Sequence, residues 1–485
     1  MNGPHRRPAV AETHISTVFF SADRAYKLLK PLATSFLDFS TTERRLAAVD
    51  DELRLNRRMA PDVYLGVADV EEHDEVVDRM LVMRRLPADR RLTALVTSPG
   101  LDDRIRQIVR AVAAFHAAEE PVRDAADIAG RDAVARNWAD NTADMAPLAG
   151  TAFDAAELDL VDGLARRYLD HSETLFDRRL ADGFVRDGHG DLTAEDIFCL
   201  DDGPRILDCL AFDRRLRISD VLCDVGFLAM DLDRLAGPDA ADTVWRYYAE
   251  FSNEHHPASL AHHYVAYRAH VRAKIACLVH RQGDPEAAPL ARTYLHLCRR
   301  HLELARRRLV LVGGTPGTGK TTLTEVISRT FGWASVSTDP IRKELTGRAH
   351  TDHEFSAPGT GIYSPAISTE TYRETFRRAG LLLEAGESVI VDASFSDQVQ
   401  RSHGRALAAR TGADVIELEC VVDRGEAAER LARRLAADED ASDARPEILG
   451  ELRAAHAPWP EAITIATDGP LATSEAAALA AIRSS

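Results

Sequence analysis

Residues 309–322 read LVLVGGTPGTGKTT, an apolar run that leads directly into a glycine-rich turn. The stretch matches the G-x-x-x-x-G-K-[ST] pattern of a P-loop, or Walker A motif, and the apolar run supplies the strand that this motif requires. Backbone N–H groups of such a loop surround phosphate oxygens, and the following helix presents its positive N-terminal end. The residues assigned to nucleotide binding by this match are Gly314, Gly317, Gly319, Lys320, Thr321 and Thr322.

The motif assigns separate tasks to two of these side chains. Lys320 is expected to reach the β- and γ-phosphates of ATP, and the Thr321 hydroxyl is expected to hold Mg²⁺. The sequence therefore predicts a nucleoside triphosphate site in this part of the chain.

Strands and helices alternate from residue 308 onward. Apolar segments (LVLVGG, ASVSTD, SVIVDAS, DVIELECVV and AITIAT) are separated by helical ones. With a P-loop at the first turn, this alternation predicts a doubly wound parallel sheet. Asp392 ends one of these apolar strands, where it is expected to hold Mg²⁺ through water or to touch the acceptor.

The segment STDPIRKEL follows the second expected strand. Asp339 lies at the carboxyl end of that strand, and Arg342 follows three residues later. Ligands of open α/β sheets bind outside the carboxyl ends of the strands, so both residues are expected to face the site. Asp339 is expected to take the proton from an acceptor hydroxyl, and Arg342 to steady the acceptor or the developing phosphoryl charge. The alternative for Asp339 is a helix N-cap before Pro340, and the two roles can coexist.

A second phosphate-transfer signature occurs at residues 189–196, HGDLTAED. Asp191 and Asp196 have the spacing of the catalytic Asp and the metal-binding Asn in kinase-type catalytic loops. A hairpin turn at 201–205 then returns Asp208, at the end of an apolar strand, beside this loop. Asp196 and Asp208 are thus expected to share Mg²⁺, while Asp191 faces the acceptor hydroxyl.

Upstream residues fit such a site. Lys27 lies in a β-rich segment and Glu52 on the following helix, as a phosphate-anchoring Lys–Glu pair requires. Lys30 and Glu43 are alternative partners that the sequence leaves open.

Composition limits the classes of partner. The net charge of −17 disfavours nucleic-acid and anionic-membrane binding, and no apolar run reaches transmembrane length. The six cysteines form no C-x-x-C pair, which favours buried thiols over a metal site. We therefore expect a cytoplasmic protein that acts on a small molecule. The oligomeric state is not predicted.

At this point the chain shows a family resemblance. Residues 1 to about 300, with the motifs THIS…YKLLKP, FLDFSTTERR, ELRLNRRMAPDVYLGV, GHGDL and FLAMDL, resemble the aminoglycoside-phosphotransferase-like kinase fold. Residues from about 308, with GGTPGTGKTT, STDPIRKEL and VIVDASF, resemble the small P-loop kinases that include polynucleotide kinase, gluconate kinase, zeta toxin and chloramphenicol phosphotransferase. The combination resembles the fused phosphotransferase/P-loop AAA family ATPase proteins of actinobacteria.

The resemblance implies two domains, at 1–305 and 306–485, and two Mg–ATP sites. It also implies that Arg430 and Arg434, at i, i+4 helical spacing, are lid arginines over the phosphates; a solvated helix face is the alternative. In similar P-loop kinases the residue matching Asp339 is the general base.

Three departures concern the first domain. Asp196 replaces the usual Asn, position 211 is Ala where similar chains often carry an acid, and SADR stands in the first hairpin in place of a glycine-rich loop. The functional prediction is an ATP-dependent phosphotransferase that acts on a small-molecule hydroxyl. The alternative is a P-loop kinase regulated by a catalytically weak, kinase-like sensing domain.

Overall fold

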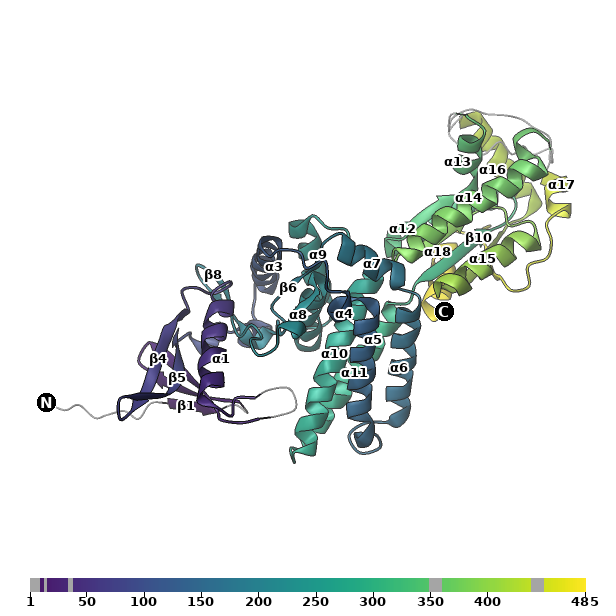
Figure 1. Cartoon of the computed structure of the whole chain (residues 1–485). Coiled ribbons are helices and arrows are strands. Elements are labelled where there is room, and N and C mark those ends of the chain that lie inside the picture. The colour runs from purple at the N-terminus through teal and green to yellow at the C-terminus, as the bar shows by residue number, and fades with distance from the viewer. Residues whose placement is uncertain (1–8, 13–14, 34–37, 349–359, 438–448) are drawn as a thin grey trace. The chain divides into compact units, whose positions relative to one another are not determined.

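The computed structural model describes residues 9–12, 15–33, 38–348, 360–437 and 449–485 (Figure 1). The chain forms two compact units. One consists of Met1–Ala165, Phe176–His256 and Leu260–Glu303, and the other of Arg166–Leu175, Pro257–Ser259 and Leu304–Ser485. The second unit thus includes two short segments that the expected ranges 1–305 and 306–485 assign to the first.

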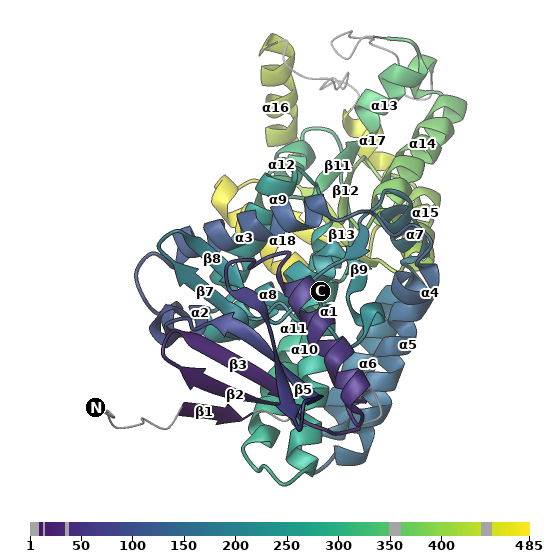
Figure 2. The same cartoon turned by 60° about the vertical axis from the view of Figure 1, so that its left-hand side comes forward.

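The first unit begins with an antiparallel sheet in the order β1-β2-β3-β5-β4 (Figure 2). Its strands are β1 (Ala9–Glu12), β2 (Ser16–Ser21), β3 (Arg24–Leu29), β4 (Tyr64–Glu72) and β5 (Glu75–Arg84). The SADR turn joins β2 to β3, with Ala22 in the left-handed region at φ 51°. Strand β1 was not expected from the sequence.

Helix α1 (Thr42–Asn56) packs against this sheet and places Glu52 toward β3. The Thr41 side chain caps its first turn by accepting a hydrogen bond from the Arg44 N–H (3.4 Å). Val49 on the helix and Leu81 on β5 belong to the same buried cluster.

The chain between residues 92 and 304 is mainly helical. Its helices are α2 (Leu92–Leu95), α3 (Leu101–Ala118), α4 (Ala126–Ala129), α5 (Arg131–Met145), α6 (Ala155–Asp170), α7 (Glu173–Ala181), α8 (Val221–Ala236), α9 (Pro238–Ser252), α10 (Ala258–Arg281) and α11 (Ala287–Leu304). Two short antiparallel pairs interrupt them. These are β6 (Val185–Asp187) with β9 (Ile218–Asp220), and β7 (Ile197–Leu200) with β8 (Gly203–Ile206). The β7–β8 pair is the expected hairpin, although β8 starts within its predicted turn.

The second unit is built on a parallel sheet in the order β11-β12-β10-β13-β14. Its strands are β10 (Arg308–Gly313), β11 (Ala334–Ser337), β12 (Val389–Asp392), β13 (Asp414–Val421) and β14 (Ile463–Ala466). Its helices are α12 (Lys320–Phe331), α13 (Thr338–Leu345), α14 (Pro365–Glu384), α15 (Gln398–Thr411), α16 (Arg424–Ala437), α17 (Leu449–Ala454) and α18 (Leu471–Ser484). The expected fold class, α+β in the first unit and parallel α/β in the second, is confirmed.

Successive residues of β10 face two different cores. Leu309 and Leu311 join the cluster that includes α14 and α15, whereas Val310 and Val312 join the cluster that includes α12 and α18. Because both faces are covered, the strands are almost wholly apolar, which is typical of parallel sheets. The register pairs Val312 with Asp392 and brings the carboxyl ends of β10 and β12 together.

Two further expectations concern membrane-spanning segments and cysteine thiols. Among the described residues, no helix combines the length and apolarity needed to cross a bilayer. The six cysteines are free thiols, and all but Cys199 are buried.

We predict that Gly313→Ala destabilises the second unit. A Cβ atom at Gly313 would lie 2.2 Å from Cζ3 of the buried Trp459 ring, and overpacking of this kind costs about 1–3 kcal/mol. Denaturant unfolding followed by tryptophan fluorescence measures the loss. Gly469→Ala is the control, because no atom lies within 4 Å of its Cβ position. Equal stability of the two variants would contradict the packing argument.

Candidate active site

The P-loop lies between β10 and α12, as the motif requires. Gly319 is the N-cap of α12, and Lys320 begins the helix and donates from Nζ to the Thr315 carbonyl (3.2 Å). Gly317 has φ 82°, and a Cβ atom there would lie 2.7 Å from the Ala427 carbonyl oxygen. Only glycine fits this position, because its φ is positive and α16 leaves no room for a Cβ atom.

A hydrogen bond joins the expected Mg²⁺ ligands. The Thr321 hydroxyl, in the first turn of α12, donates to Asp392 Oδ2 at 2.9 Å. Asp392 is buried and ends β12, directly beside Val312 of β10. The pair thus lies at the carboxyl edge of the sheet, next to the start of the P-loop, where a metal bound to phosphate oxygens would meet both groups.

Helix α13 carries Asp339 and Arg342, the two residues expected to face the phosphoryl acceptor. This helix starts at Thr338 with Ser337 in the N-cap position, so Asp339 lies in the first turn and the N-cap alternative for it is wrong. Asp339 is half-buried and lies just after β11. The pKa of the buried Tyr372 is raised mainly by burial, and the charge of Asp339 raises it further.

Arg342 is buried on the same helix. Its Nη1 donates to the Ile362 carbonyl and to the Ser368 hydroxyl, both at 3.2 Å, and its guanidinium stacks over Tyr363 at 4.8 Å. In this conformation Arg342 therefore holds the segment at 361–368, and its contact with an acceptor or phosphoryl group stays a prediction.

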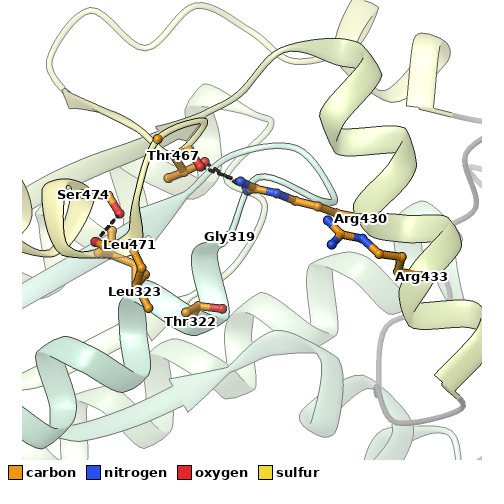
Figure 3. A pocket seen from close by; sticks show the side chains of 9 residues that line it. Gly319, Thr322, Leu323, Arg430, Arg433, Thr467, Leu471 and Ser474 are labelled. Carbon is orange, nitrogen blue, oxygen red and sulfur yellow. Dashed lines mark hydrogen bonds between the residues drawn. The ribbon is translucent and has the colours of Figure 1, made fainter.

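A pocket of about 480 Å³ opens beside the P-loop (Figure 3). It is lined by Gly319, Thr322, Leu323, Arg430, Arg433, Thr467, Gly469, Leu471 and Ser474. Arg430 extends from α16 across the pocket and donates to the Thr467 carbonyl and hydroxyl oxygens (2.5 and 3.4 Å). The structure thus places Arg430 beside the loop, and its role as a lid arginine stays a prediction. The side chain of Arg434 lies outside the described residues.

In the first unit, Lys27 is the centre of a charged triad. Its Nζ lies 2.7 Å from Glu52 Oε1 and 3.0 Å from Asp208 Oδ1. The partner that the sequence left open is therefore Glu52, because Lys30 instead pairs with Glu12 at 2.7 Å. Burial acts to lower the pKa of Lys27, but the charges of Asp208 and Glu52 outweigh it and hold the pKa above its ordinary value.

The two carboxylates of this triad differ in environment. Burial raises the pKa of Glu52, whereas the Lys27 charge lowers that of Asp208. The Asp208 side chain is 57% exposed, so solvent screens its pairing with Lys27. Its backbone has φ 62°, and its N–H donates to the Tyr64 hydroxyl at 3.0 Å. This tyrosine contact fixes the turn that aims Asp208 toward Lys27.

The loop at 189–196 is held by two acids of α8. Asp224 accepts hydrogen bonds from the His189 and Gly190 N–H groups, the latter at 2.9 Å, and Asp231 accepts from the Ala194 N–H at 3.0 Å. His189 Nε2 lies 3.0 Å from the Leu207 carbonyl, which ties the loop to the strand before Asp208.

Sequence reasoning assigned no role to Asp224 or Asp231. The sequence feature that could have identified them is their spacing of seven residues within VLCDVGFLAMDLD, which places both on one face of an otherwise apolar helix. Two buried acids on such a face need polar partners. Burial acts to raise the pKa of Asp224, but the hydrogen bond from His116 and the Arg268 charge outweigh it and hold the pKa below its ordinary value. Asp224 thus stays ionised and can hold both N–H groups.

Asp191 and Asp196 both have raised pKa values. For Asp191 the cause is burial, opposed by the charges of Arg272 and His189. For Asp196, burial and the charges of Asp208 and Asp191 raise the pKa to about 8, although the Thr193 hydroxyl donates to it at 2.9 Å. Crowded carboxylates of this kind are what a divalent cation would neutralise.

The oxygen ligands available at the two candidate sites fit Mg²⁺. Among the residues that the structure describes, no three or more His, Cys, Asp or Glu side chains cluster in a way that could hold a metal. Protein Mg²⁺ sites usually need only one or two carboxylates together with phosphate oxygens. Asp196 with Asp208, and Thr321 with Asp392, each supply such a set.

Comparison with known proteins shows similarity to a family model and to curated relatives. Residues 309–459 match the family model described as "AAA domain". The chain is 38% identical over 468 residues to the uncharacterized protein Rv2004c of Mycobacterium tuberculosis, covering 95% of this chain and 92% of that protein. It is 30% identical over 146 residues to the adenylate kinase of Clavibacter michiganensis, covering 29% of this chain and 70% of that enzyme.

Solved structures are similar as well. Among them is a choline/ethanolamine kinase family protein from Mesorhizobium loti, with a TM-score of 0.40 and 14% identity, and the match covers 62% of this chain and 93% of that one.

The raised pKa of Asp196 generates a pH prediction. With a pKa of about 8, Asp196 is largely protonated at pH 7, so Mg²⁺ must displace a proton to use its carboxylate. We expect the apparent Mg²⁺ affinity of the nucleotide-bound first unit to rise by up to about tenfold per pH unit from pH 6 to 8, then level off. Mg²⁺ titration in the Lys320→Ala background, which weakens the P-loop site, measures this. Asp196→Asn should flatten the dependence, and an unchanged slope in that variant would refute the assignment.

Proposed function

We propose that this chain, which belongs to the same family as the mycobacterial protein Rv2004c, is a phosphotransferase that moves the γ-phosphate of ATP to a hydroxyl of a small molecule. The observation that carries the proposal is the Thr321–Asp392 hydrogen bond of 2.9 Å at the mouth of a complete P-loop. A glycine-rich turn without nucleotide chemistry has no need for a buried carboxylate beside this hydroxyl.

In the P-loop unit each residue acts on a different part of the reaction. The backbone N–H groups from Gly314 to Lys320 surround the phosphates, and the Lys320 ammonium meets the charge of the transferring phosphoryl group. The pocket lined by Arg430 and Thr467 takes the rest of the nucleotide. Mg²⁺, held by Thr321 and Asp392, supplies charge neutralisation when bound.

The proposed acceptor site lies at α13. Asp339 takes the hydroxyl proton as the acceptor oxygen bonds to the γ-phosphorus and the bond to ADP breaks. Arg342 and Tyr363 form one wall of this side, supported by their stacking at 4.8 Å. The net charge of −17 favours a small molecule over a nucleic acid as acceptor.

For the first unit we propose a second Mg–nucleotide site. Lys27, steadied by Glu52, binds phosphate oxygens, Asp196 and Asp208 hold Mg²⁺, and Asp191 faces an acceptor hydroxyl. Regulation by a sensing unit is a second candidate function. It is favoured by the protonation of Asp196 near neutral pH and by the SADR hairpin, which offers no glycine-rich cover for phosphates.

We predict that Lys320→Ala lowers ATP turnover by about a hundredfold or more, because an electrostatic group at the transferring phosphoryl is lost. The full chain is required, since the second unit includes Arg166–Leu175 and Pro257–Ser259. ADP release is the readout. Lys274→Ala, which removes only a partly exposed lysine 3.7 Å from Asp144, is the matched control. Equal turnover in both variants would overturn the assignment of the P-loop.

The number of nucleotide sites has its own test. In the Lys320→Ala protein we expect one remaining Mg²⁺-dependent ATP site by calorimetric titration, and its loss when Asp208→Ala is added. The reason is that Asp208 is both the Lys27 partner at 3.0 Å and a Mg²⁺ ligand. If Lys320→Ala alone abolishes all ATP binding, the first unit has no nucleotide site.

A further inference from the structure

The segment from His456 to Trp459 is fixed against the strand that carries the P-loop. The buried Trp459 ring lies where a side chain at Gly313 would project. Arg401 on α15 donates to the carbonyl oxygens of Phe395 (2.7 Å), Ala457 and Pro458 (both 2.6 Å), and its guanidinium stacks over Trp459 at 4.6 Å. These contacts hold the segment at the carboxyl edge of the sheet.

His456 at the start of this segment pairs with an acid of β13. Its Nε2 lies 2.9 Å from Glu419 Oε1, and Glu419 is the register partner of Gly313, the last residue of β10. Neighbouring strands are about 4.8 Å apart, so this carboxylate stands one strand away from the first residues of the P-loop.

The pairing determines which imidazole nitrogen carries the proton. A carboxylate accepts but does not donate, so Nε2 holds the proton and Nδ1 is left with a lone pair. Nδ1 is buried and has no hydrogen-bond partner among the residues that the structure describes. A carboxylate that orients an imidazole whose second nitrogen is open is the arrangement of a general base.

The charges around His456 favour its neutral form. Burial lowers the pKa of the imidazole, Glu419 on β13 raises it, and the positive charges of Arg401 on α15 and Lys320 on α12 lower it further. The net direction is downward from the ordinary value, so Nδ1 is free to take a proton at neutral pH. The effect of Lys320 also indicates that the ring lies within electrostatic range of the phosphate site.

We propose that His456, oriented by Glu419, activates water and gives the P-loop unit a second activity, the hydrolysis of ATP when no acceptor is present. This rests on the proposed function, which supplies ATP at the P-loop. A water proton moves to Nδ1, the water oxygen bonds to the γ-phosphorus, and the bond to the β,γ-bridging oxygen breaks with its electron pair leaving on ADP. The proton then passes to solvent, giving ADP, phosphate and H⁺.

Burial and position favour water over a larger nucleophile. Only 10% of the His456 side chain and 19% of Glu419 are exposed, and Nδ1 is itself buried, so a sugar-sized acceptor cannot reach it. Asp339 follows β11, two strands from β10 on one side, whereas Glu419 lies on β13, next to β10 on the other side. The two proton acceptors therefore approach the P-loop from opposite sides and serve different nucleophiles.

The test measures phosphate release from ATP by the full chain with no acceptor added. His456→Gln should lower the rate by about a hundredfold, a usual contribution of a general base, with ATP affinity changed less than about twofold. His403→Gln, on the exposed face of α15, is the matched control and should keep the hydrolysis rate. If the His456→Gln rate is within about threefold of the control, the inference is wrong.

A pH profile separates proton transfer from a structural role. Wild-type hydrolysis should fall on acidification with a midpoint below 6.5, because Nδ1 becomes protonated. Glu419→Gln keeps an acceptor for the Nε2 proton but removes the charge that raises the pKa, so the midpoint should move to lower pH. The residual rate of His456→Gln should not show this fall on acidification. The same fall in that variant would overturn the proposal.

The two levels of proposal fail in different ways. If Lys320→Ala leaves turnover unchanged, the P-loop function itself is wrong. If Lys320→Ala abolishes turnover while His456→Gln does not alter acceptor-free hydrolysis, only the water-activating pair is wrong.

Discussion

The parallel pairing of β10 with both of its neighbours is the constraint on which the P-loop unit depends. The register sets Val312 beside Asp392 on one side and Gly313 beside Glu419 on the other. A shift of one residue would turn either carboxylate to the opposite face of the sheet. The aliphatic residues of β10 belong to two separate cores, so any slip would expose or overpack both. Two apolar cores thus fix the positions of the polar groups.

In the first unit, buried charge rather than apolar packing fixes the position of a candidate site loop. Asp224 is buried and binds two backbone N–H groups of the 189–196 loop, and the Arg268 guanidinium lies 3.8 Å from it. A buried carboxylate is costly unless hydrogen bonds and opposite charge surround it, and this one has both. The loop conformation therefore follows from the ionisation of one helical side chain.

Local patterns predicted most of the strands and the P-loop, because each rests on periodicity or on a motif whose parts are close in sequence. For the Lys27–Glu52 pair the sequence left Lys30 and Glu43 open, and the contacts in the fold decide between them. The sequence did not indicate strand β1, which is only four residues long and fully exposed. The Asp224 contacts also escaped it, since their partners lie more than thirty residues away on another element. His456 belongs to no motif, and only the fold brings it to Glu419.

The discontinuity of the second unit has a consequence for the order of folding during synthesis. The Arg307 guanidinium donates to the His171 carbonyl at 2.9 Å, and the Ser259 hydroxyl donates to the Gly386 carbonyl at 2.6 Å. Residues 166–175 leave the ribosome long before the parallel sheet exists, at translation rates of about 5–20 residues per second. These early segments must wait many seconds for their partners. Nascent chains of this protein thus present an incomplete surface that favours chaperone binding until translation ends.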